Sequence, residues 1–289
     1  MTASVIIVNW NAGPALGACL ESLASERVDE VIVVDNGATD GSTAAAVADH
    51  PQTRVVETGA NLGFAAGANR GADAARGDVV VFLNPDARVV PDALATLVDA
   101  LLVTPGAGIA GGGLSDERGR WQPAWARFAP VAHLVLDTTP GRVVHRLRRE
   151  PYRVDWVYGT FMAVRRDIFR QLGGFDAHYF VYGEDLDLCY RAAGLGIRTW
   201  HVPAARAVHG ANVSATQRFG AGREAAVVRG EMRFYASRAG PAALRRFRAV
   251  AACKFGMKTV LAAALGRHDA VARYGRVVRA CVGLGDGVG

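Results

Sequence analysis

The fold is decided by the stretch VIVVDNGATDGS, residues 31–42. Its four consecutive β-branched residues predict a strand that is buried on both faces, and the polar, glycine-containing segment behind them predicts a tight turn into a helix. Similar short runs occupy residues 5–8, 54–57 and 79–83, and stretches of helical length rich in Ala and Leu separate them. Strands that alternate with helices predict an α/β fold with a doubly wound, mostly parallel sheet.

Polar residues follow three of these predicted strands directly. The segments are Asn9-Trp10-Asn11, Asp35-Asn36 and Asn84-Pro85-Asp86. In a parallel sheet the carboxyl ends of the strands meet at one edge, and ligands bind there. We therefore expect a ligand site built from these segments.

Two of the acidic residues allow two interpretations each. Asp35 can accept the ring N–H of a pyrimidine base, but Asp35 and Asp40 can also only stabilise the turn and begin the next helix. Asp86 can hold Mg²⁺ or Mn²⁺ together with phosphate oxygens, because these hard cations prefer oxygen ligands. Turn chemistry explains Asn84-Pro85-Asp86 equally well when it is taken alone.

The segment Asn61–Gly71 combines a polar turn with a helix of small residues. Small residues permit a close approach of a ligand to the backbone, but they also permit tight packing of a helix on the sheet. The glycine spacing does not match the G-x-G-x-x-G pattern of dinucleotide sites. A second candidate, His209, follows a strand-like run near Val208, where its imidazole can be structural or can complete a metal site begun by Asp86.

The densest group of chemical side chains is the segment GGFD at 173–176 with the segment GEDLDLCYR at 183–191. Glu184, Asp185 and Asp187 are three carboxylates within four residues, and mutual repulsion can raise one pKa into the range of a general base. The alternative is an acidic helix start stabilised by the helix dipole. Four aromatic residues flank the group and are predicted to form an apolar wall: Phe175, Tyr179, Phe180 and Tyr182.

Composition narrows the class of protein. A chain of 289 residues that is 51% hydrophobic can bury a large core, and no apolar run approaches the length of about 20 residues that crosses a bilayer. The N-terminus has no signal-peptide pattern, so we expect a cytoplasmic location. The four cysteines lie far apart with no CxxC pair, which argues against both disulfides and a zinc cluster.

The positive charge is unevenly distributed. The formal net charge is +6, with basic clusters at 142–149 and 238–279, whereas the first hundred residues carry more acid than base. A nucleic-acid enzyme more often has its positive charge along the catalytic cleft, so we expect an anionic membrane surface and no nucleic acid as the partner. A solvated pair of helices packed on the rest of the chain is the alternative for the basic tail.

Taken together, these sequence segments resemble the family 2 glycosyltransferases of the GT-A fold, and within that family the rhamnosyltransferase-like branch. The resemblance covers residues 4–214. Its matching blocks are Ser4–Asn11, Val33 to Ser42, Asn61–Phe64, Asn84–Asp86, Gly173–Asp176, Glu184–Asp187 and His209.

The resemblance implies a role for each position. Asp185 would be the general base with Glu184 beside it, and Asp86 and His209 would hold Mg²⁺ or Mn²⁺. One residue departs from the family pattern, because Asn84 stands where the Asp-x-Asp motif has its first aspartate and supplies no charge. The implied nucleotide-sugar-binding residues are Asn9, Asn11, Asp35, Asn36, Asn61, Gly63, Asn69 and Asn84.

The residue pattern and the resemblance together predict a division of the chain. Residues 1–215 would form the GT-A domain, with a nucleotide-sugar-binding half at 1–105 and an acceptor-binding and catalytic half at 106–215. Within the second half, the Gly-rich and aromatic stretch from about residue 106 is expected to be a flap or acceptor loop, and a strand is expected at 197–201. Residues 216–289 would form a basic, amphipathic helical tail on the inner face of the plasma membrane.

The implied reaction is an inverting, metal-dependent sugar transfer from dTDP-L-rhamnose to a polyprenyl-diphosphate-linked or other saccharide acceptor, in cell-wall or surface-polysaccharide synthesis. A UDP-hexose or UDP-galactofuranose is the alternative donor. Two other classes compete: a sugar-phosphate nucleotidylyltransferase, disfavoured because residues 4–13 contain no Lys or Arg, and a non-catalytic membrane-associated scaffold, disfavoured because Asp86, Asp185 and His209 are all present.

Overall fold

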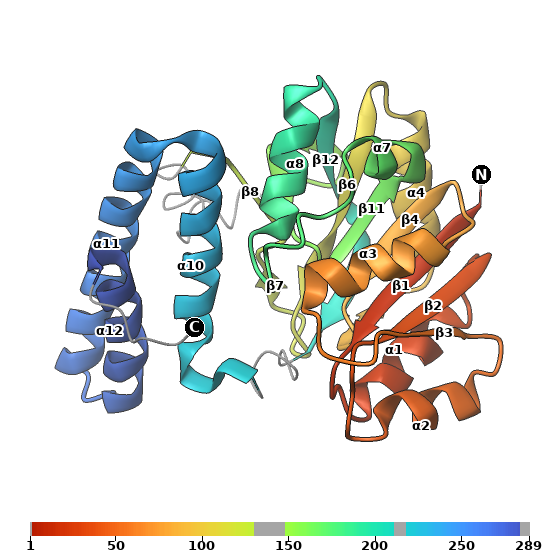
Figure 1. Ribbon diagram of the computed structural model, residues 1–289, viewed down its shortest axis with the longest axis horizontal. Helices are drawn as coiled ribbons and strands as arrows, with labels where there is room; N and C mark the ends of the chain where they lie inside the picture. The colour runs from red at the N-terminus through yellow and green to blue at the C-terminus, as the bar shows by residue number, and fades with distance from the viewer. Residues whose placement is uncertain (1, 130–147, 211–217, 284–289) are drawn as a thin grey trace.

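A ten-stranded mixed sheet forms the centre of the computed structural model, which describes residues 2–129, 148–210 and 218–283 (Figure 1). The first half of the sheet is parallel, in the order β3-β2-β1-β4. The bounds are β1 (Ala3–Asn9), β2 (Glu30–Asp35), β3 (Arg54–Glu57) and β4 (Val79–Leu83). These are the four strands that the sequence predicts, with β3 and β4 matching to the residue.

The second half of the sheet is mixed. β11 (Phe161–Arg165) runs antiparallel between β4 and β6 (Ala107–Ser115), and β6 pairs in parallel with β12 (Arg198–His209). β5 (Ala87–Val89) closes the edge, antiparallel to β12. The short strands are β7 (Trp121–Gln122) on β6, β9 (Tyr152–Val154) on β12, and the separate pair β8 (Trp125–Ala126) and β10 (Trp156–Val157).

Helices cover both faces of the sheet because the strands are apolar on both faces. In β1, Ile6 and Val8 belong to one core cluster, whereas Val5 and Ile7 belong to the other. One face carries α1 (Ala15–Leu23), α2 (Ser42–Asp49) and α4 (Ala93–Val103), and the other carries α3 (Phe64–Ala74), α7 (Arg166–Gln171) and α8 (Glu184–Gly194). The predicted doubly wound arrangement is confirmed.

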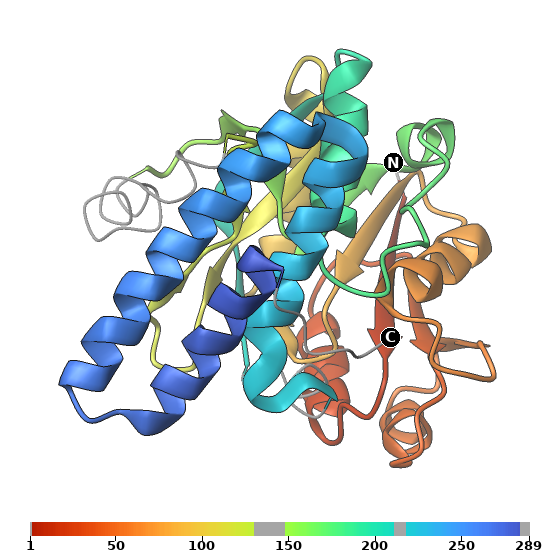
Figure 2. The ribbon, with the colours of Figure 1, turned by 60° about the vertical axis from the view of Figure 1, so that its left-hand side comes forward.

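Three C-terminal helices stand beside the sheet, with α10 nearest to it (Figures 1 and 2). They are α10 (Arg223–Phe234), α11 (Pro241–Ala264) and α12 (His268–Val282), with a 3₁₀ turn at Gly220–Gly222 and a π-helical segment at Tyr235–Ala239. Phe234, Phe247 and Val277 belong to the same core cluster as α3 and α8. The helical tail is therefore packed on the rest of the chain.

Two expectations about the middle of the chain need correction. The stretch from residue 106 is not simply a loop, because β6 is a central strand that includes Gly111 and Gly112. A Cβ atom at these two positions would lie 2.4 Å from Val157 and 2.3 Å from Phe161 respectively, so the glycines let neighbouring side chains reach the sheet. The strand expected at 197–201 continues to His209. The remainder of the expected flap, 130–147, and most of the basic cluster 142–149 lie outside the described residues.

Within the described part of the chain, none of the helices has the length and hydropathy needed to cross a bilayer. The four cysteines carry free thiols, of which Cys253 is exposed.

Candidate active site

Two cavities meet at the carboxyl edge of the sheet. The strand-edge cavity, of about 140 Å³, is lined by Trp10, Asn61 and Asp86 among others. The aromatic cavity, of about 490 Å³, contains Asp185 and several tryptophans. Asn84 and Tyr182 line both cavities, together with Phe64 and Val181. The two spaces therefore form one continuous site with its junction at Asn84.

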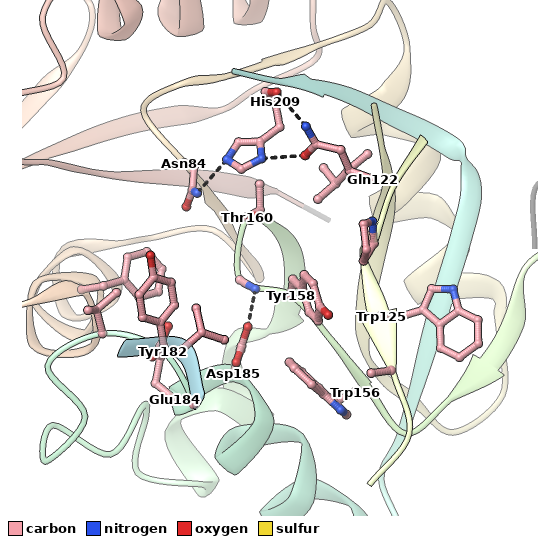
Figure 3. Close-up of a pocket in the computed structure, with 18 of the residues that line it drawn as sticks. Asn84, Gln122, Trp125, Trp156, Tyr158, Thr160, Tyr182, Glu184, Asp185 and His209 are labelled. Carbon is pink, nitrogen blue, oxygen red and sulfur yellow. Dashed lines mark hydrogen bonds between the residues drawn. The ribbon is translucent and has the colours of Figure 1, made fainter. Parts of the chain in front are cut away.

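The junction brings together the predicted metal residues. Asp86 follows β4 and His209 ends β12, and the His209 Nε2 atom lies 3.4 Å from Asp86 Oδ1 and 3.4 Å from Asn84 Nδ2. The side chains of Asp86 and His209 are each only 7% exposed to solvent. On the far side of the ring, Nδ1 lies 3.0 Å from Gln122 Oε1 (Figure 3). Since that oxygen can only accept, Nδ1 donates to it, and Nε2 is the ring atom that faces Asp86.

Asp185 occupies the start of α8, directly after Gly183 and Glu184. Gly183 has φ +97°, a conformation that favours glycine, and it turns the chain into the helix. The Asp185 carboxylate accepts the main-chain N–H of Gly159 at 3.0 Å (Figure 3). It also accepts the main-chain N–H of the next residue, Leu186, at 2.7 Å. Burial raises the pKa of Asp185 to about 6, and these hydrogen bonds oppose the rise. The carboxylate is therefore oriented and basic enough to take a proton.

Glu184 lies beside the base and is nearly buried, at 5% exposure. Burial raises its pKa well above the usual range, and the charge of Asp185 adds to the rise. Its Oε2 atom is buried and has no hydrogen-bond partner in the described structure. Glu184 is thus a carboxyl group held in the aromatic cavity, where it can hydrogen-bond to a ligand.

The third carboxylate of the acidic segment has a structural role. The Asp187 side chain is fully buried and accepts from Arg191 Nε at 2.7 Å and from Arg238 Nε at 2.6 Å. The expectation that all three carboxylates repel one another is therefore wrong for Asp187, whose charge is compensated by two guanidinium groups. Arg238 lies 51 residues farther along the chain, so the acidic segment alone cannot reveal this pairing.

Asn36, Asn61 and Gly63, three of the predicted nucleotide-sugar-binding residues, line the strand-edge cavity. The Asn36 amide donates to Asn61 Oδ1 at 3.2 Å and to the Gly63 carbonyl at 3.1 Å, which fixes the turn before α3. Gly63 has φ +84°, and a Cβ there would lie 2.2 Å from the Phe180 carbonyl oxygen. The close approach that glycine permits at this position is therefore to another loop of the protein.

Four of the predicted nucleotide-sugar-binding residues line neither cavity. Asn9 is fully buried and donates to Ser42 and Thr43, so its prediction as a ligand contact is wrong. Asn69 uses both amide atoms on the main chain of Phe175, at 2.8 and 2.9 Å.

The other two residues stabilise the turn after β2. Asn11 Oδ1 accepts the N–H of Thr39 at 2.7 Å, and one Asp35 oxygen accepts the N–H of Ala38 at 2.9 Å. Asp40 accepts from the main chain and hydroxyl of Ser42, as the turn interpretation predicts.

The expected aromatic wall is only partly correct. Phe175 and Tyr179 are buried in the core, whereas Phe180 and Tyr182 line the strand-edge cavity. The aromatic residues that line the aromatic cavity come instead from the middle of the chain, where β7 pairs with β6 and β8 pairs with β10. They are Trp121, Trp125, Trp156 and Tyr158.

The C-terminal segment supplies site residues that the sequence did not indicate. Glu231 and Arg223 of α10 line the aromatic cavity, and Arg218 lines the strand-edge cavity with its guanidinium 4.2 Å above the Phe180 ring. Burial raises the pKa of Glu231 to about 7, with Lys254 opposing the rise and Asp185 adding to it. Glu231 sits in an ordinary amphipathic helical pattern, so only the docking of α10 reveals it.

The donor set at the junction is consistent with a divalent ion. A carboxylate and an imidazole are ligands that Mn²⁺ accepts, and substrate oxygens commonly complete such a site. Within residues 2–129, 148–210 and 218–283, no group of three His, Cys, Asp or Glu side chains is gathered for metal binding. A metal here would rely on two protein ligands.

Comparisons with known proteins agree with this geometry. The N-acetylglucosaminyl-diphospho-decaprenol L-rhamnosyltransferase of Mycobacterium tuberculosis is 37% identical over 230 residues, which cover 71% of this chain and 75% of that protein. The rhamnosyltransferase WbbL of Escherichia coli is 50% identical over 56 residues, 19% of this chain and 21% of that protein.

The fold also has solved counterparts. The mannosyltransferase PcManGT of Pyrobaculum calidifontis, solved with GDP-Man and Mn²⁺, superposes with a TM-score of 0.59 at 21% identity, over 98% of this chain and 76% of that one. The expected GT-A type of fold is thereby confirmed. The family model described as glycosyl transferase family 2 matches residues 4–173. With the rhamnosyltransferase similarity across most of its length, the chain belongs to glycosyl transferase family 2.

Proposed function

We propose that this glycosyltransferase moves L-rhamnose from dTDP-L-rhamnose to a polyprenyl-diphosphate-linked N-acetylglucosamine, with inversion at the anomeric carbon. The similarity to the mycobacterial rhamnosyltransferase supports the choice of substrates. The observation that carries the reaction type is the position of Asp185, an oriented carboxylate in the cavity that adjoins the Asp86–His209 pair.

The proposed reaction uses Asp185 as the general base and the two adjoining cavities as the sites for donor and acceptor. Asp185 takes the proton of the acceptor hydroxyl as that oxygen attacks the anomeric carbon, and the nucleoside diphosphate leaves from the opposite face. Single displacement inverts the configuration and needs no second carboxylate as a nucleophile. The N–H groups of Gly159 and Leu186 hold the carboxylate in place throughout.

The residues that would hold Mg²⁺ or Mn²⁺ are Asp86 and His209, with Gln122 fixing the imidazole. A divalent ion there would offset charge on the leaving diphosphate, an electrostatic contribution of several kcal/mol. Arg218, at the same cavity, can add a fixed positive charge for that diphosphate.

The donor and acceptor ends differ in chemistry. The strand-edge cavity combines amide side chains, Asn36 and Asn61, with the rings of Phe180 and Tyr182. These rings can form an apolar wall for the methyl group of a 6-deoxy sugar, which discriminates by only about 1–3 kcal/mol. A UDP-hexose or UDP-galactofuranose therefore stays the alternative donor.

The aromatic cavity suits the acceptor sugar. Trp125, Trp156 and Tyr158 offer flat apolar faces with polar edges, and Glu184 and Glu231 offer hydrogen-bond acceptors for hydroxyl groups. A saccharide has both kinds of surface, and Asp185 lies in the same cavity.

A lipid-linked acceptor implies work at a membrane, and the exposed face of α11 supports this. Met257, Val260 and Leu261 are 59%, 71% and 61% exposed, and with Leu265 they repeat at the spacing i, i+3, i+4, i+8 on one helical face. Lys258, which is exposed, lies next to this stripe, whereas Lys254 is half-buried and acts on Glu231. We infer that this stripe docks on the anionic inner face of the plasma membrane while residues 1–215 carry the reaction.

The experiment is a donor panel. Purified protein, with Mn²⁺ and a short-chain polyprenyl diphosphate N-acetylglucosamine, is given dTDP-L-rhamnose, UDP-glucose or UDP-galactofuranose, and the product is identified by mass spectrometry and its anomeric configuration read by NMR. A rhamnosylated product of inverted configuration is expected. Turnover with a UDP-sugar and none with dTDP-L-rhamnose would overturn the rhamnosyl assignment, and a retained configuration would overturn the mechanism.

A further inference from the structure

A third cavity, of about 680 Å³, adjoins the aromatic cavity and differs from it in charge. Three arginines line it, Arg148, Arg149 and Arg206, and none of its lining residues carries a carboxylate. Leu114 and Trp121 line both cavities. We name this space the basic cavity. Nothing in the reaction described above uses it.

An irregularity in the central sheet creates one side of the basic cavity. Val202 of β12 pairs with Gly112 of β6, but the next pair is Arg206 with Gly113, so residues 203–205 bulge out of the ladder. Arg206 is exposed between the buried residues Ala205 and Ala207. The bulge thus presents a guanidinium group at the cavity.

One layer of rings separates the basic cavity from the aromatic cavity. The Arg148 guanidinium lies 4.9 Å above the ring of Tyr152, and that ring packs edge-on against His201 at 5.3 Å and Trp125 at 5.6 Å. Trp125 is among the residues that line the aromatic cavity, and His201 is among those that line the basic cavity. A ligand that spans both spaces therefore has to extend only past this layer.

The arginines are available for an anion. Neighbouring basic residues have carboxylate partners, as Arg120 has Asp116 and Arg127 has Asp155. For Arg148, Arg149 and Arg206, no ion pair to a carboxylate occurs within the described ranges. Guanidinium groups bind phosphate oxygens in a bidentate manner, and several together favour a polyanion.

We propose that the basic cavity binds the diphosphate of the lipid-linked acceptor while its sugar occupies the aromatic cavity. This inference rests on the proposed function, in which the diphosphate is attached directly to that sugar. The donor's diphosphate is assigned to a different place, because Asp86 and Arg218 lie at the strand-edge cavity, beyond Asn84.

The test compares two acceptors that differ only in the diphosphate: N-acetylglucosaminyl diphosphate with a short alkyl tail, and the neutral alkyl N-acetylglucosaminide. The variant is Arg149→Gln with Arg206→Gln. The matched control is Arg198→Gln, which removes an exposed arginine from the other end of β12. In the double variant we expect KM for the diphosphate acceptor to rise at least about tenfold, with KM for the neutral acceptor and for the donor unchanged.

Two further arms keep the inference separate from the proposed function. Because Trp121 lines both cavities, its fluorescence can report binding of the diphosphate acceptor without any donor, and the double variant should show the same loss of affinity whichever donor proves correct. Flotation with vesicles of 30% anionic lipid should be unaffected. Any of three results would overturn the diphosphate assignment. They are equal changes in KM for both acceptors, no change in KM for either acceptor, and loss of vesicle binding with unchanged affinity for the diphosphate acceptor.

Discussion

At the scale of the residue, Asp185 is held by hydrogen bonds that only an acceptor can satisfy. In Asp185→Asn the amide group must turn its NH₂ toward the N–H of either Gly159 or Leu186, and it can no longer take a proton. We expect transfer to fall by at least about 100-fold, while calorimetry shows dTDP-L-rhamnose still bound. Near-normal turnover would remove the base assignment from Asp185. The role of general base could not then be assigned to Asp187, because its carboxylate is paired with Arg191 and Arg238.

The raised pKa of Asp185 predicts the acid limb of the rate profile. A base works only when ionised, and burial raises the pKa of Asp185 to about 6. We expect kcat/KM to be lost as pH falls through about 6, so the rate at pH 5 should be about tenfold below its plateau. The measurement is a pH series at saturating metal. A flat profile between pH 5 and 8 would contradict the assignment.

A substitution at Asn84 can test the metal site, because it should strengthen metal binding. Asn84 lies at the junction, with its amide nitrogen 3.4 Å from His209 Nε2, and it adds no charge to Asp86. Asn84→Asp supplies a second carboxylate, so the Mn²⁺ concentration that half-restores activity to chelator-treated enzyme should fall several-fold. His209→Gln should raise the Mn²⁺ concentration that half-restores activity. Full activity of the wild-type enzyme after rigorous metal removal would show that no ion is needed.

The proximity of Asp86 and His209 could be predicted from the sequence. Asp86 and His209 lie together because strand ends meet at one edge of a sheet, a rule that needs only the strand pattern. Asn9 and Asn69 were mistaken for ligand contacts because their true partners are distant in sequence. Asn69, for example, binds the main chain of Phe175, 106 residues away.

At the scale of the element, α10 packs closely against the segment before α8, at Gly183 and Gly230. A Cβ on Gly230 would lie 2.1 Å from the Tyr182 carbonyl oxygen, and one on Gly183 would lie 2.9 Å from the Gly230 carbonyl oxygen. Arg223 adds a hydrogen bond to the Tyr182 hydroxyl at 3.3 Å. This contact is what brings Glu231 into the aromatic cavity.

Gly230→Ala should therefore displace α10. We expect a lower melting temperature and a KM for the acceptor at least about tenfold higher, with KM for the donor changed less. The matched control is Gly256→Ala in α11, where a Cβ meets nothing within 4 Å and the helix should gain up to about 1 kcal/mol. Identical behaviour of the two variants would show that the α10 contact does not shape the acceptor site.

Elements with a clear period were predictable, and elements made by packing were not. The β-branched runs of β2 and β4 can be recognised as strands from the sequence alone. Glycine weakens a strand in isolation, so the run Gly111–Gly113 within β6 indicated irregular chain, and the side chains of Val157 and Phe161 explain Gly111 and Gly112. The pairing of β8 with β10 joins segments about thirty residues apart, which no local pattern encodes.

At the scale of the whole molecule, the C-terminal helices serve two surfaces at once. Their inner side belongs to the core and to the aromatic cavity, through Phe234 and Glu231. Their outer side carries the apolar stripe of Met257, Val260, Leu261 and Leu265. The sequence predicted a basic helical tail and left open whether it packs or binds membrane. Since α10 packs inward and α11 exposes the stripe, the two roles do not compete for the same side chains.

The stripe predicts how the protein meets a membrane. Its apolar residues can insert between headgroups, and the exposed Lys258 beside them should contribute about 1 kcal/mol on an anionic surface. We expect the protein to float with vesicles containing phosphatidylserine or phosphatidylglycerol and not with neutral ones. Leu261→Asp with Leu265→Asp should abolish flotation, whereas Val103→Asp, which alters an equally exposed apolar residue at the end of α4, should not.

The same variants connect docking to catalysis. If α11 only delivers the enzyme to its lipid-linked acceptor, Leu261→Asp with Leu265→Asp should leave kcat unchanged with a short-chain acceptor in solution and slow transfer only when the acceptor is embedded in anionic vesicles. Losing activity with both acceptors would mean that the substitutions disturb the core shared with α8. Flotation that ignored anionic lipid, or that survived in the double variant, would instead assign the stripe no role at the membrane.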